Sequence, residues 1–374
     1  MTTEDGASST DGAEATGRER FRPPGHDNDH FLMTTVVGSY PKPKWVDRMR
    51  DLYESDRTED DDPRLYVDDD AWAEAKDDAA RLITAEHERA GIDVVTDGEM
   101  RRNEMIEYFM HRVDGTEFPG RVKVWGHSYF DKPAVVEEIA YGEEWLVSEF
   151  EFEQEVAAHP VKVPITGPYT LARFSFDEVY ESTEELSLEL ADLVRQEVEN
   201  LVEAGANYVQ IDEPALAQVP GDHAIVGESL EIITENVPQD VRVGLHVCYG
   251  DYSRIYPEVL DFPIDEFDLE LANGDFDQID VFKEPAFSKD FALGVVDAHD
   301  AEVESVAEIK ANIRTGLEVV PPERLTVSPD CGLKLLPREV AYRKMSNMAQ
   351  AAREVEEELD AGEIEAGTAR AGGD

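Results

Sequence analysis

Short apolar runs alternate along the chain with longer segments in which apolar residues recur every three to four positions. Most of the short runs are rich in β-branched residues, as is typical of parallel strands buried on both faces. The pattern predicts eight strands, at residues 34–37, 93–96, 161–165, 208–211, 243–247, 267–270, 292–296 and 325–327. The longer segments between them have the period of amphipathic helices.

The clearest helical segment lies between residues 182 and 205. Leucine and valine side chains form one broad stripe at positions 186, 190, 193, 194, 198, 201 and 202. Ser182 and Glu185 have the spacing of a capping box, and Gly205 is the residue type that commonly ends a helix. This segment is therefore predicted to be a long helix with one face in the core.

Strands that alternate with helices predict an α/β protein, a (β/α)8 TIM barrel. The alternative is an open, doubly wound sheet, but no glycine-rich phosphate loop follows an early strand. Residues 115–160 interrupt the alternation and predict a β-hairpin inserted between the second and third barrel strands. The predicted domains are a disordered acidic tail at 1–28, one barrel over 29–358, and a second disordered tail at 359–374.

Charge is the most unusual bulk property of the chain. There are 85 Asp and Glu residues against 34 Lys and Arg residues, of which 11 are Lys, and the net charge is −51. Such a field repels nucleic acid and anionic lipid, and it destabilises the compact state by self-repulsion. Concentrated salt screens this repulsion, because the Debye length is about 3 Å at 1 M. We therefore predict a halophilic protein that loses its fold and activity at low ionic strength.

Two further observations concern location. No run of 18 apolar residues is present, and the N-terminus lacks the charged and apolar regions of a secretory signal. The chain is thus predicted to be soluble and cytoplasmic, with no membrane partner. In a reducing cytoplasm the two cysteines are expected to serve metal or redox chemistry rather than a disulfide.

Polar residues follow every predicted strand, at the end that lies on the catalytic rim of a barrel. These rim segments are Gly38-Ser39, Asp97-Gly98-Glu99, Thr166-Gly167-Pro168, Asp212-Glu213-Pro214, His246-Val247-Cys248, Glu270, Asp297-Ala298-His299 and Asp330-Cys331-Gly332. One such position is explained by chance, but all eight together predict a site.

A metal site is the first chemical prediction. His246 and Cys248 are two residues apart, so their side chains point to the same side of a strand. Cys331 ends the last strand, and Glu270 lies between them around the ring. Imidazole nitrogen, two thiolates and a carboxylate suit Zn²⁺. The alternatives are a buried histidine beside an inert cysteine, and a closed structural zinc site.

Two thiolate ligands leave such a zinc site with a net charge near −1, which suits activation of a substrate thiol better than generation of hydroxide. Glu99 and Asp212 supply negative charge for an amino group, and backbone amides near Ser39 are placed for a carboxylate. The substrate is then an amino-acid thiol. Asp297 and His299 are placed to form an oriented acid–base pair.

Each of these acids has a less specific explanation. Glu99 has Arg101 and Arg102 as near neighbours for an ion pair. One member of the pair Asp212-Glu213 is equally consistent with a solvated or helix-capping carboxylate. Asp297 and His299 also fit an ordinary surface loop.

Seven segments carry a family resemblance: VVGSYP, TDGEMRRNEMIEYF, ITGPYTL, VQIDEPAL, HVCYG, GVVDAH and SPDCGLK. In this order they cover nearly all of residues 33–335, and they resemble the catalytic barrel of cobalamin-independent methionine synthase. The separation of Cys248 and Cys331 is also similar to that of the family.

The resemblance implies that a zinc-bound homocysteine thiolate attacks an activated methyl group. By motif position, the zinc ligands are His246, Cys248, Glu270 and Cys331, and the homocysteine-binding residues are Gly38, Ser39, Glu99 and Asp212. His299 matches the proposed acid that protonates the departing folate nitrogen, and Asp297 orients it.

Two departures from the family affect the methyl donor. The chain resembles short archaeal members that comprise the catalytic barrel alone, whereas long members carry a second, N-terminal barrel. Phe174 stands where the family has a tryptophan that stacks on folate. The donor is left as a methyl-folate, another methyl-pterin or a methylated corrinoid protein, with a separately encoded N-terminal-like barrel as a further partner. Alternative functions are a zinc methyltransferase for another thiol such as coenzyme M, and a zinc-binding subunit that needs a partner.

Overall fold

The computed structural model describes residues 31–55, 65–124, 128–219 and 221–364. The predicted tail at 1–28 and residues 365–374 of the second tail lie outside this description. The barrel was expected to end at residue 358, but the last helix, α9 (Arg338–Asp360), continues to Asp360. In the described part of the chain, no helix is both long enough and apolar enough to cross a membrane.

Seven parallel strands form the central sheet, in the order β1-β10-β9-β8-β7-β6-β4. Their bounds are β1 Met33–Thr34, β4 Val163–Thr166, β6 Tyr208–Asp212, β7 Arg242–Val247, β8 Glu266–Leu269, β9 Asp290–Gly294 and β10 Leu325–Ser328. The predicted strand at 93–96 forms only isolated bridges: Val94 pairs with Thr35, and Val95 pairs with Val161. These two parallel bridges connect both edges of the sheet, which confirms the predicted barrel class.

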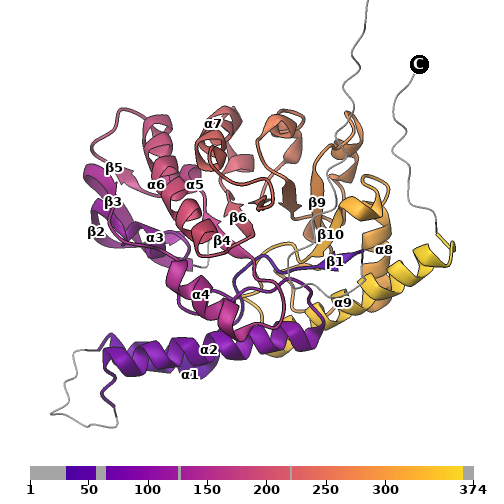
Figure 1. The fold of residues 1–374 in the computed structure, drawn as a ribbon, viewed down its shortest axis with the longest axis horizontal. Helices are drawn as coiled ribbons and strands as arrows, with labels where there is room; N and C mark the ends of the chain where they lie inside the picture. The colour runs from indigo at the N-terminus through magenta and orange to yellow at the C-terminus, as the bar shows by residue number, and fades with distance from the viewer. Residues whose placement is uncertain (1–30, 56–64, 125–127, 220, 365–374) are drawn as a thin grey trace, which may run out of the picture.

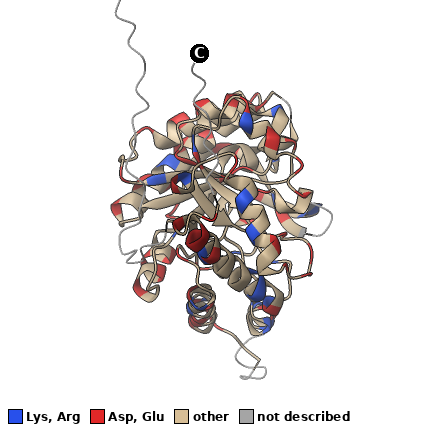
Figure 2. Cartoon of the chain, turned by 90° about the vertical axis from the view of Figure 1, so that its right-hand side faces the viewer, with Lys and Arg blue, Asp and Glu red and all other residues tan. Residues whose placement is uncertain are grey.

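Helices cover the outside of the sheet (Figure 1). The α-helices are α1 Lys44–Tyr53, α2 Asp69–Ala90, α3 Glu107–Met110, α4 Val147–Val156, α5 Pro168–Arg173, α6 Thr183–Glu203, α7 His223–Thr234, α8 Val306–Gly316 and α9. Short 3₁₀ helices are η1 Leu216–Gln218, η2 Tyr252–Arg254, η3 Glu258–Asp261, η4 Ala272–Gly274, η5 Ile279–Lys283 and η6 Pro322–Arg324. Asp and Glu residues are distributed over the outer helices and loops (Figure 2).

The long helix α6 begins and ends close to its predicted bounds. Ser182 Oγ accepts a hydrogen bond from Glu185 N at 3.1 Å, which caps the N-terminus. The Glu185 carboxylate accepts from Glu181 N instead of the Ser182 backbone, so only half of the predicted capping box forms. Gly205 has a φ of 105°, a conformation that glycine adopts without strain and that lets the chain leave the helix.

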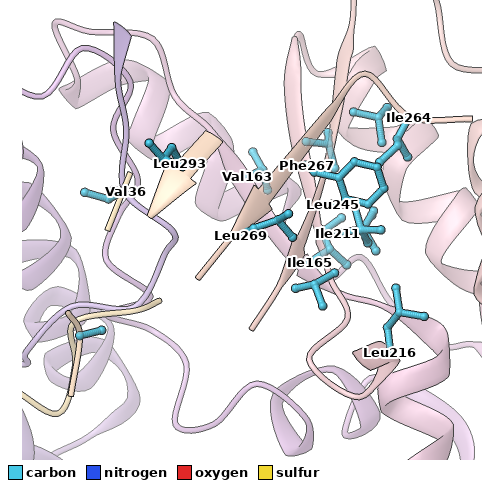
Figure 3. Packing of buried hydrophobic residues seen from close by; sticks show 14 of the residues in the cluster. Val36, Val163, Ile165, Ile211, Leu216, Leu245, Ile264, Phe267, Leu269 and Leu293 are labelled. Carbon is cyan, nitrogen blue, oxygen red and sulfur yellow. The ribbon is translucent and has the colours of Figure 1, made fainter. Parts of the chain in front are cut away.

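Alternate strand residues face the helices and the barrel axis. Ile211, Leu245 and Phe267 belong to the apolar cluster beneath the helices (Figure 3). The intervening positions carry buried polar residues that contact one another across strands. Near the N-terminal ends of the strands, Glu266 accepts from Arg242 Nη2 at 2.6 Å, from Thr326 Oγ1 at 2.9 Å and from Tyr208. The barrel interior is therefore polar, unlike the outer core.

An antiparallel hairpin, β2 (Val113–Val124) and β3 (Ser128–Tyr141), lies between the second and third barrel segments. The short strand β5 (Phe176–Asp177) adds to β3 in parallel. Because β5 follows α5, which begins at the C-terminal end of β4, the hairpin sits on the rim side of the barrel (Figure 1).

Candidate active site

Three side chains with metal-binding atoms meet at the barrel mouth. One ligand atom from each of His246, Cys248 and Cys331 lies within 4.8 Å of the others. The sulfur atoms of Cys248 and Cys331 are 3.6 Å apart, and both thiols are free. Because a disulfide requires about 2.05 Å, the two cysteines are not covalently joined, and both thiols could bind a metal ion.

The His246 ring supports a metal-binding role for this group. It is 2% exposed, and its Nδ1 lies 3.5 Å from Asp268 Oδ1. Among the described residues, neither ring nitrogen makes a hydrogen bond of good geometry. Nδ1 faces the Asp268 carboxylate, whereas burial of Nε2 without a hydrogen bond is costly, and a metal ion bound between Nε2 and the two sulfurs would satisfy it.

The two thiols differ in acidity. The contact with Cys248 is the main influence that lowers the pKa of Cys331, and the nearby His246 ring lowers it further. The same contact, together with burial, raises the pKa of Cys248. Cys331 is therefore the thiol of this pair that ionises first.

Glu270 lies beside the group but is not one of its members. Its Oε1 accepts a hydrogen bond from Asn273 Nδ2, and its Oε2 accepts from Tyr249 N at 3.4 Å. Asp330 fixes the same loop, since its Oδ1 accepts from the backbone nitrogens of Leu271 and Ala272, both at 2.9 Å. The loop thus fixes the Glu270 carboxylate beside the two thiols, near enough for its charge to raise the pKa of Cys248.

The predicted amino-group residues, Asp212 and Glu99, follow barrel segments on either side of β4. Asp212 is buried, which raises its pKa to about 7, and it accepts a hydrogen bond from Gln210 Nε2 at 2.8 Å. Glu99 has a φ of 57° and forms a loose ion pair with Arg102 at 3.8 Å. The ion pair that was considered as an alternative role for Glu99 is therefore present, although it is long. A Cβ at Gly38 would lie 2.7 Å from Glu99 Oε1, which explains a glycine there.

Ser39 joins the first and last strands of the ring. Its carbonyl accepts from Leu333 N at 2.8 Å. A Cβ at Gly332 would lie 2.0 Å from Ser39 Oγ, so the hydroxyl packs against the residue that follows Cys331. This contact places Ser39 next to Cys331, one of the three residues with metal-binding atoms.

Glu213 is the member of the pair Asp212-Glu213 that has a capping role. Its two carboxylate oxygens accept from Tyr169 N at 3.0 Å, Thr170 N at 2.8 Å and Thr170 Oγ1 at 2.6 Å, all in the first turn of α5. Burial raises the pKa of Glu213 to about 7. Glu213 therefore supports α5, and Asp212 remains available to the site.

Asp297 and His299 follow β9 and are in contact. His299 N donates to Asp297 Oδ1 at 2.7 Å, and Nδ1 of the same ring lies 3.4 Å from that oxygen. The other ring nitrogen, Nε2, contacts the hydroxyl of Tyr249, which directly follows Cys248. This chain of contacts connects the acid–base pair to the metal group.

Phe174 occupies a more peripheral position. It directly follows α5, is half-buried, and packs against the hydrophobic core. Three other interior residues that touch the site were not among the predicted site residues: Lys162, Gln210 and Asp268. Each is a polar residue in a mostly apolar strand segment, two or four positions before a polar residue at the rim, so its side chain points to the same face. This spacing could have identified them from the sequence.

Comparison with known proteins gives the family. Residues 32–354 match the model for the cobalamin-independent synthase, catalytic domain. The methionine synthase of Saccharolobus solfataricus is 41% identical over 331 residues, which are 88% of this chain and 96% of that protein. The methionine synthase of Thermococcus kodakarensis is 42% identical over 330 residues, 88% of this chain and 95% of that protein.

Solved structures agree with this match. The B12-independent methionine synthase from Shewanella sp. W3-18-1, in complex with selenomethionine, has a TM-score of 0.78 and 25% identity, and covers 88% of this chain and 99% of its own. A methyltransferase from Methanosarcina mazei shares the fold, with a TM-score of 0.59 and 16% identity. With the family model matched along most of its length, this chain belongs to the cobalamin-independent methionine synthases and has their catalytic domain.

Proposed function

We propose that this chain methylates the thiol of homocysteine to form methionine, with Zn²⁺ held by His246, Cys248 and Cys331. The observation that carries the proposal is the meeting of a buried imidazole and two thiols within 4.8 Å. One nitrogen and two sulfur donors suit zinc. Bound zinc lowers the pKa of a coordinated thiol and so supplies a nucleophilic thiolate near neutral pH.

Glu270 is the proposed fourth ligand. Its carboxylate neighbours both thiols but has hydrogen-bond partners of its own in Asn273 and Tyr249. An oxygen ligand with such an alternative resting place is the one best suited to give way to a substrate sulfur. This assignment rests on the motif position and on the nearness of the carboxylate to the cysteines.

The carboxylates favour an amino acid as the thiol substrate. Asp212 and Glu99 follow barrel segments on either side of β4, close enough for the Glu99 charge to act on Asp212, and they suit a cationic amino group, while Gly38 and Ser39 offer backbone amides for a carboxylate. The anionic sulfonate of coenzyme M would meet these carboxylates with repulsion. Homocysteine therefore fits the site better than coenzyme M.

Asp297 and His299 are the proposed proton-transfer pair. Sulfur–carbon bond formation breaks the bond between the methyl group and its donor, and the departing pterin nitrogen keeps the electron pair and needs a proton. His299 supplies that proton, and Asp297 holds its ring. We propose a methyl-pterin or methyl-folate donor that stacks on Phe174. The other donor is a methylated corrinoid protein, and a separately encoded barrel is a further partner.

The test is X-ray absorption at the zinc edge on protein kept in high salt, with and without homocysteine. We expect the sulfur count to rise from the two cysteines to three when homocysteine is added. A count that stays at two, with zinc bound, would contradict the proposal. Addition of coenzyme M in place of homocysteine is the matched control.

A further inference from the structure

A buried lysine in the barrel interior contacts both halves of the site. Lys162 precedes β4 and is 1% exposed. Its Nζ lies 3.6 Å from Asp268 Oδ2 and also donates to Gln210 Oε1. Asp268 is the neighbour of the metal-binding His246, and Gln210 is the neighbour of Asp212.

We propose that Lys162 is a positioning residue that sets the metal half of the site through Asp268 and the amino-acid half through Gln210. The part of this inference that concerns homocysteine binding rests on the proposed function. It extends that function to residues in the barrel interior that touch neither the metal nor the substrate.

The first branch orients the imidazole. Asp268 and His246 are direct partners in the register of β7 and β8, and Nδ1 faces the Asp268 carboxylate. Ser328 Oγ donates to Asp268 Oδ2 at 3.2 Å, so the carboxylate is held by both Lys162 and Ser328. With Nδ1 turned to Asp268, Nε2 is the nitrogen left for the metal. Carboxylates that orient ligand histidines in this way contribute strongly to metal affinity.

The second branch orients an amide. An ammonium group can only donate hydrogen bonds, so Lys162 requires the oxygen of Gln210 to face it. The NH₂ group of Gln210 must then point the other way, where it donates to Asp212 Oδ1 at 2.8 Å and to Val37 O at 2.9 Å. Val37 directly precedes Gly38. Lys162 thus determines which end of the amide meets the substrate-binding carboxylate.

The alternative role of Lys162 is charge balance alone. A buried ammonium is costly unless it is paired, and Asp268 provides the counter-charge, while the Tyr208 ring lies 5.5 Å from Nζ. A lysine with only this role would affect the free energy of unfolding, and would change neither the zinc affinity nor the homocysteine affinity of the folded protein. The two roles can therefore be separated by measurement.

The experiment compares Lys162→Met, Asp268→Asn and Gln210→Met in the full chain at high salt. The control is Thr326→Val, which removes a buried hydroxyl that donates to Glu266 in the same barrel interior. Zinc affinity is measured by chelator competition, homocysteine affinity by calorimetry and KM, and folding by circular dichroism. We expect Asp268→Asn to weaken zinc binding about 10- to 100-fold with little change in KM. Gln210→Met should raise KM about tenfold and leave zinc binding unchanged.

Lys162→Met should show both effects. Zinc and homocysteine affinities of Lys162→Met within twofold of those of Thr326→Val would overturn the inference. If Lys162→Met does not fold, the charge-balanced double variant Lys162→Met/Asp268→Asn takes its place and is compared with Asp268→Asn alone, and equal KM values in these two variants would overturn the inference. Absence of homocysteine binding by the unaltered protein would contradict the proposed function. The zinc affinity of Lys162→Met relative to the control would still decide the metal branch of the inference.

Discussion

The sulfur atoms of Cys248 and Cys331 lie 3.6 Å apart although 83 residues separate them in the chain. Cys248 follows β7 and Cys331 follows β10, and two strands, β8 and β9, lie between them in the sheet. Curvature of the sheet around the barrel axis brings the two thiols and His246 to one point. Thiols at this separation are close enough to bind one metal ion together and too far apart for a disulfide.

Replacing either thiol should abolish metal binding without loss of the fold. We expect Cys248→Ser and Cys331→Ser to lose zinc and methyl transfer, because a serine hydroxyl is a poor zinc ligand at neutral pH. Zinc content, turnover and circular dichroism are the measurements. Ser253→Ala, on the outer turn η2, is the control. Full activity in either cysteine variant would refute the metal mechanism.

His299 should affect proton transfer but not metal binding. Its Nε2 contacts Tyr249 and its Nδ1 faces Asp297, so the ring is held at the mouth of the site. We expect His299→Gln to lower kcat with a pterin donor by about 10²- to 10⁴-fold at unchanged zinc content. Asp300→Asn alters a charge on the same loop and should leave kcat unchanged. Equal losses in both variants would show that the loop, rather than the imidazole, is responsible.

The buried glutamate Glu153 of α4 should make stability depend on pH. Burial and the nearby Asp97 carboxylate raise the pKa of Glu153 from 4.5 to about 8. Thr84 Oγ1 lies within hydrogen-bond distance of both Ala80 O and Glu153 Oε1. The Thr84 hydroxyl has one proton, which it can donate to the Ala80 carbonyl while it accepts a hydrogen bond from a protonated Glu153. The two contacts are therefore consistent with a neutral Glu153 carboxyl group.

The direction of this pH dependence follows from proton linkage. Between about pH 4.5 and 8 the folded state keeps a proton that the unfolded chain has released, so the free energy of unfolding falls as pH rises, by at most about 1.4 kcal/mol per pH unit from this group. Glu153→Gln should therefore stabilise the protein more at pH 8 than at pH 5, measured by denaturant unfolding. Glu151→Gln, at an exposed position of the same helix, should show no such difference. A pH-independent gain in Glu153→Gln would contradict the shifted pKa.

The net charge of −51 should make folding depend on salt. Self-repulsion among exposed carboxylates destabilises the compact state at low ionic strength, and it is screened as salt is added. We expect helical circular dichroism and activity to be lost on dialysis from molar KCl into salt-free buffer. Sucrose at equal osmolality is the control, since it does not screen charge. A full helical signal in salt-free buffer would disprove the halophilic prediction.

Local patterns predicted those features that depend on residues close in sequence. The two-residue period of a strand placed His246 and Cys248 on one side, and the alternation of strands and helices predicted the barrel. The spacing of Ser182 and Glu185 predicted the start of α6, although Glu185 turned to a different backbone partner. Local geometry decides these features, because a strand or a first helical turn has few ways to arrange its own side chains.

Two predictions at the rim depended on neighbours outside the motif. The pair Asp212-Glu213 was ambiguous, and the nearness of Glu213 to α5 made it the helix cap. Glu270 remains a predicted metal ligand, and the position of its carboxylate depends on Asn273 in the loop that Asp330 holds. In both cases the deciding hydrogen-bond partners belong to segments that the motif itself does not contain.

The sequence by itself determined the order of the strands, the faces of their side chains and the types of metal-binding atoms at the rim. Only the tertiary structure decided which of these atoms meet, and that Lys162 lies between Asp268 and Gln210 in the interior. The physical reason is that a buried polar group must find its partner on another strand. That partner depends on the register and closure of the whole ring, which no single segment of the chain encodes.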